Sequence, residues 1–115
     1  MPIHFSKKER LFTLTTKNTR YVFGVSKERY LVHHFYGRKR ESFDLYKPCC
    51  YSFSPYKQEF GNTWSPDVFP QEYSFFGSGD FRTAALKLKG ADGTGVTDFS
   101  YVSHRYLQGR KEIEG

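Results

Sequence analysis

The stretch that decides the fold is residues 11–36, which read LFTLTTKNTRYVFGVSKERYLVHHFY. Short runs rich in Thr, Val, Phe and Tyr alternate there with polar turns at residues 17–19 and 26–29. Runs of about four to eight such residues, broken by turn chemistry, are typical of antiparallel strands joined by tight connections. The stretch therefore predicts a three-stranded meander, with strands over residues 11–16, 20–25 and 30–36.

A second regular stretch lies closer to the C-terminus. Apolar and basic side chains alternate over residues 86–89, so residues 81–89 predict a strand. The glycines and the aspartate of residues 90–95 tolerate positive φ and predict a hairpin turn, and residues 96–107 predict the return strand. No window of useful length has an apolar period of 3.6 residues. We therefore expect an all-β, antiparallel fold with little or no helix.

The composition points the same way. The chain has 115 residues and a mass of 13.5 kDa, which is enough for one modest core but not for two domains. It holds 12 Phe, 9 Tyr and one Trp, so aromatic side chains dominate the apolar set. Such side chains fit the broad surface of a pleated sheet better than a tight helix seam.

Residues 41–80 are different in character. They contain four of the five prolines and eleven aromatic residues, including the only tryptophan, Trp64. True linkers are poor in aromatics, so this stretch is expected to be a long ordered loop region pinned by its rings. Long ordered loops within compact domains are usually functional.

The net charge of +6 is concentrated in the first forty residues, which hold ten Lys or Arg and two Glu. A basic stretch with interleaved aromatics can bind phosphates and stack bases. Here the basic residues are spaced along predicted strands and turns rather than massed in a tail, which favours a solvated sheet surface. Nucleic-acid binding is therefore the less favoured interpretation.

The two cysteines, Cys49 and Cys50, are adjacent, and neighbouring cysteines rarely bridge each other because the small ring is strained. The sequence contains no run of about 18 apolar residues, so it predicts no membrane-spanning helix. Residues 1–8 lack the apolar segment of a signal peptide. We expect a protein of the reducing cytoplasm, without a membrane partner.

The histidines and cysteines do not form a recognisable metal-ligand set. His33 and His34 point to opposite faces of a strand, so only one of them could join His4 or His104 in a site. The adjacent cysteines lack the C-x2-C spacing of a zinc site. The sequence also lacks a G-x-S-x-G nucleophile elbow and a phosphate-binding loop with its lysine. We expect no metal, no cofactor and no self-contained catalytic site.

The most unusual segment is residues 70–82, which place charged side chains among aromatics and glycines. Asp80 and Arg82 are two residues apart, so on an extended chain they share a face and can make charge-assisted hydrogen bonds. The favoured interpretation is a structural clamp that closes the long loop. The alternative is a sugar-binding edge of flat aromatics and carboxylates. The clamp candidates are Glu72, Tyr73, Asp80, Arg82 and, further along the chain, His104.

Three motifs in this order resemble a known family. They are PQEY at residues 70–73, GSGDFR at residues 77–82 and VTDFSYVSHR at residues 96–105. They are similar to the N-terminal domain of bacterial α-galactosidases of glycoside hydrolase family thirty-six. Residues 11–21, 30–37 and 109–111 also fit, so the resemblance spans nearly the whole chain.

The resemblance implies a β-supersandwich domain that precedes a (β/α)8 barrel. In that family two aspartates on the barrel act as nucleophile and acid/base of a retaining reaction, which needs two carboxylates about 5–5.5 Å apart. This chain resembles only the first part of the supersandwich, so the resemblance implies that residues 1–115 form a single partial domain, an antiparallel β-sandwich. Without the barrel and its aspartates, the chain should be inactive alone.

The resemblance also implies partners. These are the rest of the glycoside hydrolase with its barrel, neighbouring subunits of a homo-oligomer, and the α-galactoside oligosaccharides that the full enzyme would hydrolyse. In the family, loops of this domain reach a neighbouring subunit's active site, which makes the long loop a candidate for part of the substrate mouth. The candidate residues are Cys50, Phe53, Trp64 and Asp67.

Two of these candidates differ from the family pattern. Cys50 stands three positions before Phe53-Ser54-Pro55, where some members have an acidic residue. A thiol cannot accept strong hydrogen bonds as a carboxylate does, which argues against that sugar contact here. Trp64 stands where the family often has Phe, which favours packing. The alternative to an enzyme domain is a stand-alone β module that binds a carbohydrate or, through its basic patch, nucleic acid.

Overall fold

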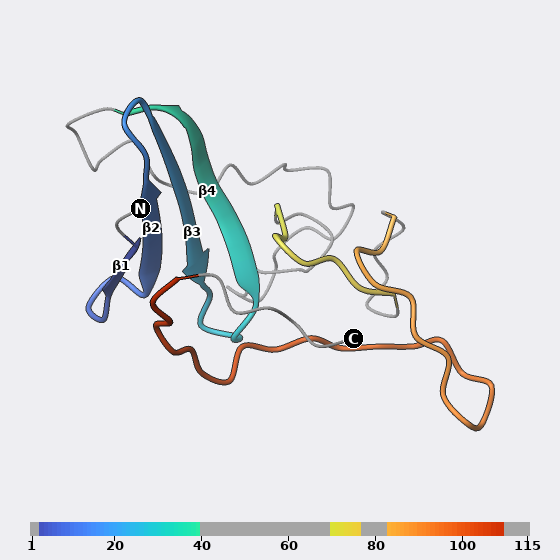
Figure 1. The fold of residues 1–115 in the computed structure, drawn as a ribbon. Coiled ribbons are helices and arrows are strands. Elements are labelled where there is room, and N and C mark those ends of the chain that lie inside the picture. The colour runs from blue at the N-terminus through green and yellow to red at the C-terminus, as the bar shows by residue number, and fades with distance from the viewer. Residues whose placement is uncertain (1–2, 40–69, 77–82, 110–115) are drawn as a thin grey trace, which may run out of the picture.

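A computed structural model describes residues 3–39, 70–76 and 83–109 of the protein, and these contain one four-stranded antiparallel sheet. Its strands are β1 (Ile3–Ser6), β2 (Leu11–Thr15), β3 (Thr19–Val25) and β4 (Leu31–Arg38). They lie side by side in chain order (Figure 1). The predicted meander and the all-β class are therefore confirmed, while β1 was not predicted.

The described residues contain no helix at all, and so none that is long and apolar enough to cross a membrane.

The two turns of the predicted meander are fastened by hydroxyl side chains. Between β2 and β3, the Thr16 backbone N–H donates to the Thr19 carbonyl at 3.0 Å, and the two threonine hydroxyls lie 2.6 Å apart. Between β3 and β4, Ser26 Oγ accepts from the Tyr30 backbone N–H at 3.1 Å. Short side chains that bond to nearby backbone groups favour turns over continued strand, which explains where the strands end.

A β-bulge in β4 determines which side chains share a face. Val22 pairs with Phe35, but the next residue of β3, Phe23, pairs with His33, so His34 is the extra residue. The bulge therefore places His33 beside Phe23, while the His34 ring lies on the other side of the sheet, next to Gly24. The prediction that the two histidines point to opposite faces is confirmed.

One face of the sheet is a continuous row of rings. Phe5 and Phe12 have ring centroids 4.4 Å apart, and Phe12 stacks on Phe23 at 4.8 Å. Tyr21 continues the row, 5.5 Å from Phe23 and 6.0 Å from Tyr36. Cross-strand aromatic pairs of this kind stabilise a sheet beyond the area that they bury. We call this surface the aromatic face; its members are Phe5, Phe12, Tyr21, Phe23, His33 and Tyr36.

The opposite face of the sheet includes deeply buried side chains. Val22 is completely buried, Val32 is 3% exposed and Thr13 is 8% exposed. Gly24 lies in the same face, paired with Leu11 on β2 and with Val32 on β4.

Gly24→Ala is expected to destabilise the fold. A Cβ at this position would lie 2.7 Å from His34 Nε2 and 2.8 Å from Leu11 Cδ2, so both side chains would have to move in a buried part of a central strand. Overpacking at such sites costs about 1–3 kcal/mol, and we expect a loss of about 1–2 kcal/mol here because both contacts are side-chain ends. Chemical denaturation followed by circular dichroism measures it. A Gly24→Ala chain as stable as the parent would show that the His34 ring turns away freely.

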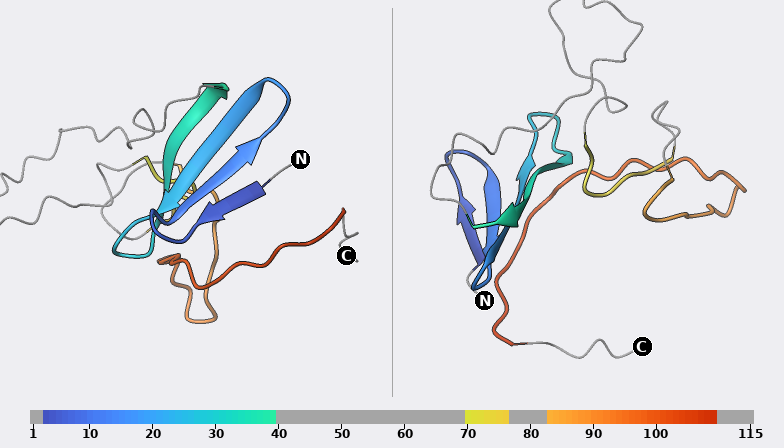
Figure 2. Two further views of the ribbon diagram at one scale, coloured as in Figure 1. Left: turned by 90° about the vertical axis from the view of Figure 1, so that its left-hand side faces the viewer. Right: turned by 90° about the horizontal axis from the view of Figure 1, so that it is seen from above.

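The two strands predicted beyond residue 80 are wrong over the described residues. Residues 83–107 carry the predicted alternation, but their backbone makes only isolated bonds to the rest of the structure, such as Thr97 N–H to the Phe76 carbonyl at 2.7 Å. Figure 2 shows that the hairpin around residue 93 projects beyond the sheet rather than covering a face of it. A strand needs a neighbouring strand with which to form a continuous ladder of backbone hydrogen bonds. Among the described residues, no segment forms such a ladder with residues 83–107.

The turn predicted between those strands is present. The Gly90 N–H donates to the Thr94 carbonyl at 2.8 Å, and Gly93 has a φ of 82°, which favours glycine. Asp92 Oδ1 accepts from the backbone N–H and the hydroxyl of Thr94, at 3.0 and 2.8 Å. These hydrogen bonds lower the pKa of the Asp92 carboxyl. Local turn chemistry therefore holds even where the flanking ladder does not form.

Candidate functional site

The segment of residues 70–76 is attached to the open edge of β4. The His33 N–H donates to the Pro70 carbonyl at 2.7 Å, and the Glu72 N–H donates to the Leu31 carbonyl at 3.0 Å. Between these bonds Gln71 pairs with Val32 in an antiparallel bridge. The segment thus covers the first residues of an edge strand that would otherwise present unpaired backbone groups. The arrangement also carries the Glu72 side chain onto the aromatic face.

The Glu72 carboxylate joins two members of the aromatic face. Its Oε1 lies 2.6 Å from His33 Nδ1, and its Oε2 accepts a hydrogen bond from the Tyr21 hydroxyl. The Glu72 side chain is 19% exposed and the His33 side chain 38%, so the contact is partly shielded from water. Burial, followed by the hydrogen bond and the negative charge of Glu72, raises the pKa of the Tyr21 hydroxyl. We call Tyr21, His33 and Glu72 the Glu72 cluster.

This raised pKa predicts a loss of stability in alkaline solution. An unfolded tyrosine ionises near its ordinary pKa of about 10, whereas folded Tyr21 keeps its proton to higher pH. Above about pH 10 the unfolded state therefore binds fewer protons than the folded state, and the free energy of unfolding falls as the pH rises. The contribution of Tyr21 is fully present below about pH 10 and is lost as the pH climbs toward the folded-state pKa.

The measurement compares the parent chain with Tyr21→Phe by urea denaturation at about pH 9 and about pH 11. Tyr21→Phe should be the less stable chain at the lower pH, and the gap should narrow at the higher pH. Tyr36→Phe is the matched control, because Tyr36 lies on the same face but is 69% exposed. A gap that stays constant or widens would contradict the assignment to Tyr21.

A second segment, residues 97–107, lies against the same end of the sheet. The Tyr101 N–H donates to the Arg29 carbonyl at 2.6 Å, and Arg29 Nε donates back to the Tyr101 carbonyl at 2.9 Å. The His104 ring then meets Phe5 and Phe12 edge-on, with centroids 4.5 and 4.7 Å away. The contact of the Tyr101 hydroxyl with His104 Nδ1, at 2.7 Å, orients that ring. The segment is therefore positioned by one backbone and one side-chain hydrogen bond with Arg29 and by ring contacts.

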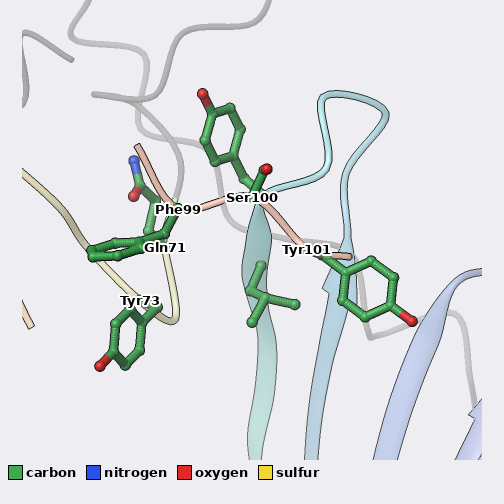
Figure 3. Close-up of a pocket in the computed structure, with 7 residues that line it drawn as sticks. Gln71, Tyr73, Phe99, Ser100 and Tyr101 are labelled. Atoms are coloured by element: carbon green, nitrogen blue, oxygen red, sulfur yellow. The ribbon is translucent and has the colours of Figure 1, made fainter. Parts of the chain in front are cut away.

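A small pocket lies where these two segments approach the start of β4 (Figure 3). Its volume is about 110 Å³. The rings of Tyr73 and Phe99 stand nearly perpendicular, 5.6 Å apart, and Phe75 lies behind them, 5.4 Å from Tyr30 and 6.1 Å from Phe99. The pocket is lined by Tyr30, Leu31, Gln71, Tyr73, Phe99, Ser100 and Tyr101.

The sequence candidates are distributed unevenly over these features. Glu72 bonds to Tyr21 and His33, Tyr73 lines the pocket and is 45% exposed, and His104 lies on the aromatic face rather than near Glu72. The remaining candidates lie outside the described residues; they are Cys50, Phe53, Trp64, Asp67, Asp80 and Arg82.

Sequence reasoning missed both partners of Glu72. Tyr21 is 51 residues away in the chain and His33 is 39 residues away, so no local spacing connects them to Glu72. The available signal was their position in neighbouring predicted strands, where a tyrosine and a histidine can share a face. Both carboxylate oxygens are engaged by these partners, which suits a fastening role better than acid/base chemistry.

Comparison with known proteins places this architecture. A family model described as "Glycosyl hydrolase family 36 N-terminal domain" matches residues 29–115. A bifunctional alpha-galactosidase/sucrose kinase of Mediterraneibacter gnavus is 34% identical over 119 residues, covering all of this chain and 13% of that protein. The alpha-galactosidase AgaA of Geobacillus stearothermophilus is 28% identical over 118 residues, covering all of this chain and 16% of that protein. The chain thus spans about one seventh of the length of these relatives.

Solved structures agree with the sequence comparison. The galactosidase domain of the alpha-galactosidase-sucrose kinase AgaSK superposes with a TM-score of 0.71 at 32% identity, over 93% of this chain and 16% of that one. An alpha-galactosidase from Lactobacillus brevis gives a TM-score of 0.79 at 25% identity, over 97% of this chain and 16% of that one. The expected resemblance is confirmed: the chain belongs to the glycosyl hydrolase family 36 N-terminal domain family.

Proposed function

We propose that the chain serves as the non-catalytic N-terminal domain of an α-galactosidase, in which a barrel supplied by further polypeptide hydrolyses terminal α-galactosides. The observation that carries the proposal is the whole-chain match to alpha-galactosidases of which it covers only 13–16%. A stretch this short leaves the rest of such an enzyme to other parts of the protein.

Three exposed apolar side chains between residues 86 and 102, which do not line any of the sites described above, support this role. Leu88 is 48% exposed, Val96 65% and Val102 77%, although their spacing is that of strands with a buried face. Side chains of this kind are stabilised when a further strand or domain covers them. The proposal assigns that cover to the remaining polypeptide of the enzyme.

The proposal extends to three finer roles. The domain stabilises the enzyme, its surface contributes to contacts between subunits, and the loop region of residues 41–80 forms part of the substrate mouth. The Glu72 cluster supports the first role, because it fastens the end of that loop region to the sheet. Fixed loop ends reduce the entropy that is lost when a loop closes against a partner.

The test is an activity comparison. The chain alone is expected to release no phenol from an aryl α-galactoside. The reason is that the two catalytic aspartates of the family lie on the barrel, which residues 1–115 do not resemble. The chain joined to the polypeptide encoded downstream of it is expected to turn the substrate over.

Two results would contradict the proposal. Hydrolysis by the repurified chain alone would show that it carries its own catalytic carboxylates. A downstream reading frame without a barrel sequence would remove the enzyme to which the domain is assigned.

A further inference from the structure

The pocket between β4 and the two attached segments has the composition of a binding site for one sugar ring. Figure 3 shows Tyr73, Phe99, Gln71 and Ser100 gathered around it, while the Tyr101 ring points away. The role proposed above does not use this pocket, and it is separate from the Glu72 cluster, whose residues do not line it.

The apolar part of the pocket is a corner made of two rings. Tyr73 and Phe99 meet at an interplanar angle of 82°, so they offer one ring face and one ring edge at right angles, with Leu31 as a further apolar wall. A pyranose has an apolar C–H face of about the size of an aromatic ring, and a flat ring surface buries that face with little loss of side-chain entropy.

The polar part of the pocket argues against a purely apolar occupant. Gln71, Ser100 and the Tyr30 hydroxyl contribute hydrogen-bonding groups beside the rings, and the Tyr30 hydroxyl bonds to the Asp98 carboxylate. A hydrocarbon side chain in this space would remove water from these groups without replacing its hydrogen bonds, which costs free energy. A ligand with hydroxyls around an apolar ring satisfies both parts of the lining.

The pocket is held open by bonds that do not involve a ligand. Gln71 is fixed by its bridge to Val32, and residues 99–101 are fixed by the paired bonds between Arg29 and Tyr101. Phe75, only 2% exposed, supports both sides from behind. A site that exists before the ligand arrives does not lose affinity to loop ordering.

The volume sets the size of the ligand. A space of about 110 Å³ corresponds to three or four waters at about 30 Å³ each, which is well below the roughly 300–1,000 Å³ of a drug-sized pocket. It therefore takes part of a single ring and leaves the rest of a saccharide in solvent.

We propose that this pocket is a non-catalytic carbohydrate-binding site that takes part of one hexopyranose ring between Tyr73, Phe99 and Leu31. Gln71 and Ser100 hydrogen-bond the sugar hydroxyls, and the Tyr30 hydroxyl oxygen accepts a hydrogen bond from one of them while it donates its own proton to Asp98. The proposal goes beyond the scaffold role, and it is tested by binding rather than by hydrolysis. It would stand if the activity comparison failed.

The experiment titrates the ¹⁵N-labelled chain with methyl α-D-galactopyranoside and, separately, with methyl α-D-glucopyranoside, and follows amide resonances by NMR. A single ring in a small open pocket should bind with a Kd on the order of 1–10 mM. Saturable shifts are expected for residues 71–73 and 99–101, for one or both sugars. If neither sugar causes saturable shifts of these residues, the proposal is overturned.

Variants separate the pocket from the rest of the surface. Tyr73→Ala removes one wall at a position that is 45% exposed, and Ser100→Leu fills the space from an exposed position, so neither removes a core side chain. Tyr73→Ala should raise the Kd about tenfold or more, since a stacked aromatic surface contributes that much. Ser100→Leu should raise the Kd at least as far, because its side chain occupies the space that the sugar needs. Tyr36→Ala is the control, because Tyr36 is 69% exposed and does not line the pocket.

Two further outcomes overturn the proposal. Equal weakening by all three variants would place any sugar contact elsewhere on the surface. Saturable shifts of the same residues with N-acetyl-leucinamide, but not with either sugar, would identify the pocket as an anchor for a partner protein's apolar side chain.

Discussion

Phe75→Ala is expected to lower the free energy of unfolding by about 3–5 kcal/mol, the range for phenylalanine in a protein core. Phe75 is 2% exposed, the lowest exposure of any large described side chain. Its ring stacks on Tyr30, with 28° between the planes, and meets Phe99 edge-on. Alanine would leave a cavity between the sheet and both attached segments, so the loss should exceed the transfer free energy of the ring alone.

The neighbouring residue offers a matched control. Phe76 has the same side chain and is 56% exposed, so Phe76→Ala should change the stability by no more than about 0.5 kcal/mol. Thermal unfolding followed by circular dichroism should separate the two, with a fall in Tm of about 10 °C or more for Phe75→Ala alone. Equal losses in the two variants would mean that burial of Phe75 is not what holds the segments to the sheet.

The comparison of Phe75 with Phe76 also shows where sequence reasoning ends. The local pattern predicted β2, β3 and β4 and both of their turns, because short alternating runs and hydroxyl-rich turns depend on neighbours in the chain. Nothing in the Tyr73–Phe76 run states which ring turns inward. That choice depends on Tyr30 and Phe99, which come from distant parts of the chain.

The predicted strand over residues 96–107 shows the same limit from the other side. Val96 and Val102 alternate with polar residues, which predicts a strand with one apolar face. In the described structure these two side chains are exposed, so that apolar face exists but is not covered. A strand also needs a hydrogen-bonding neighbour, which no alternation can supply. The hairpin turn at Gly90–Thr94 was predictable because Asp92 and two glycines supply it locally.

In the candidate site too, local sequence pointed to a residue but not to its partners, which are distant in the chain. Glu72 was singled out because its carboxyl group lies in an aromatic segment, but the only pairing that the sequence suggested was between Asp80 and Arg82, which are close to each other in the chain. Over the described residues its partners are Tyr21 and His33, which the β4 bulge brings onto one face. A bulge of one residue reverses the alternation of side chains, and the sequence carries no mark of it at His34.

Glu72→Ala tests whether this carboxylate fastens residues 70–76 to the sheet. It would leave the Tyr21 hydroxyl and His33 Nδ1 without their shared partner, beneath a segment that still covers them. Each partly buried group left in this way costs about 1–3 kcal/mol, and the 38% exposure of His33 lets water satisfy part of the loss. We therefore expect a loss of about 2–3 kcal/mol in global stability.

A local measurement distinguishes fastening from general damage. The amide protons of His33 and Glu72 bond across the junction of β4 with residues 70–72, so their hydrogen exchange reports whether that junction opens. In Glu72→Ala both amides should lose protection before Val22, at the centre of the sheet, does. Glu9→Ala removes an exposed carboxylate from the turn that follows β1 and should leave all three amides unchanged. If the His33 and Glu72 amides stay as protected as in the parent, the backbone pairing alone holds the junction and Glu72 is only an accessory to it.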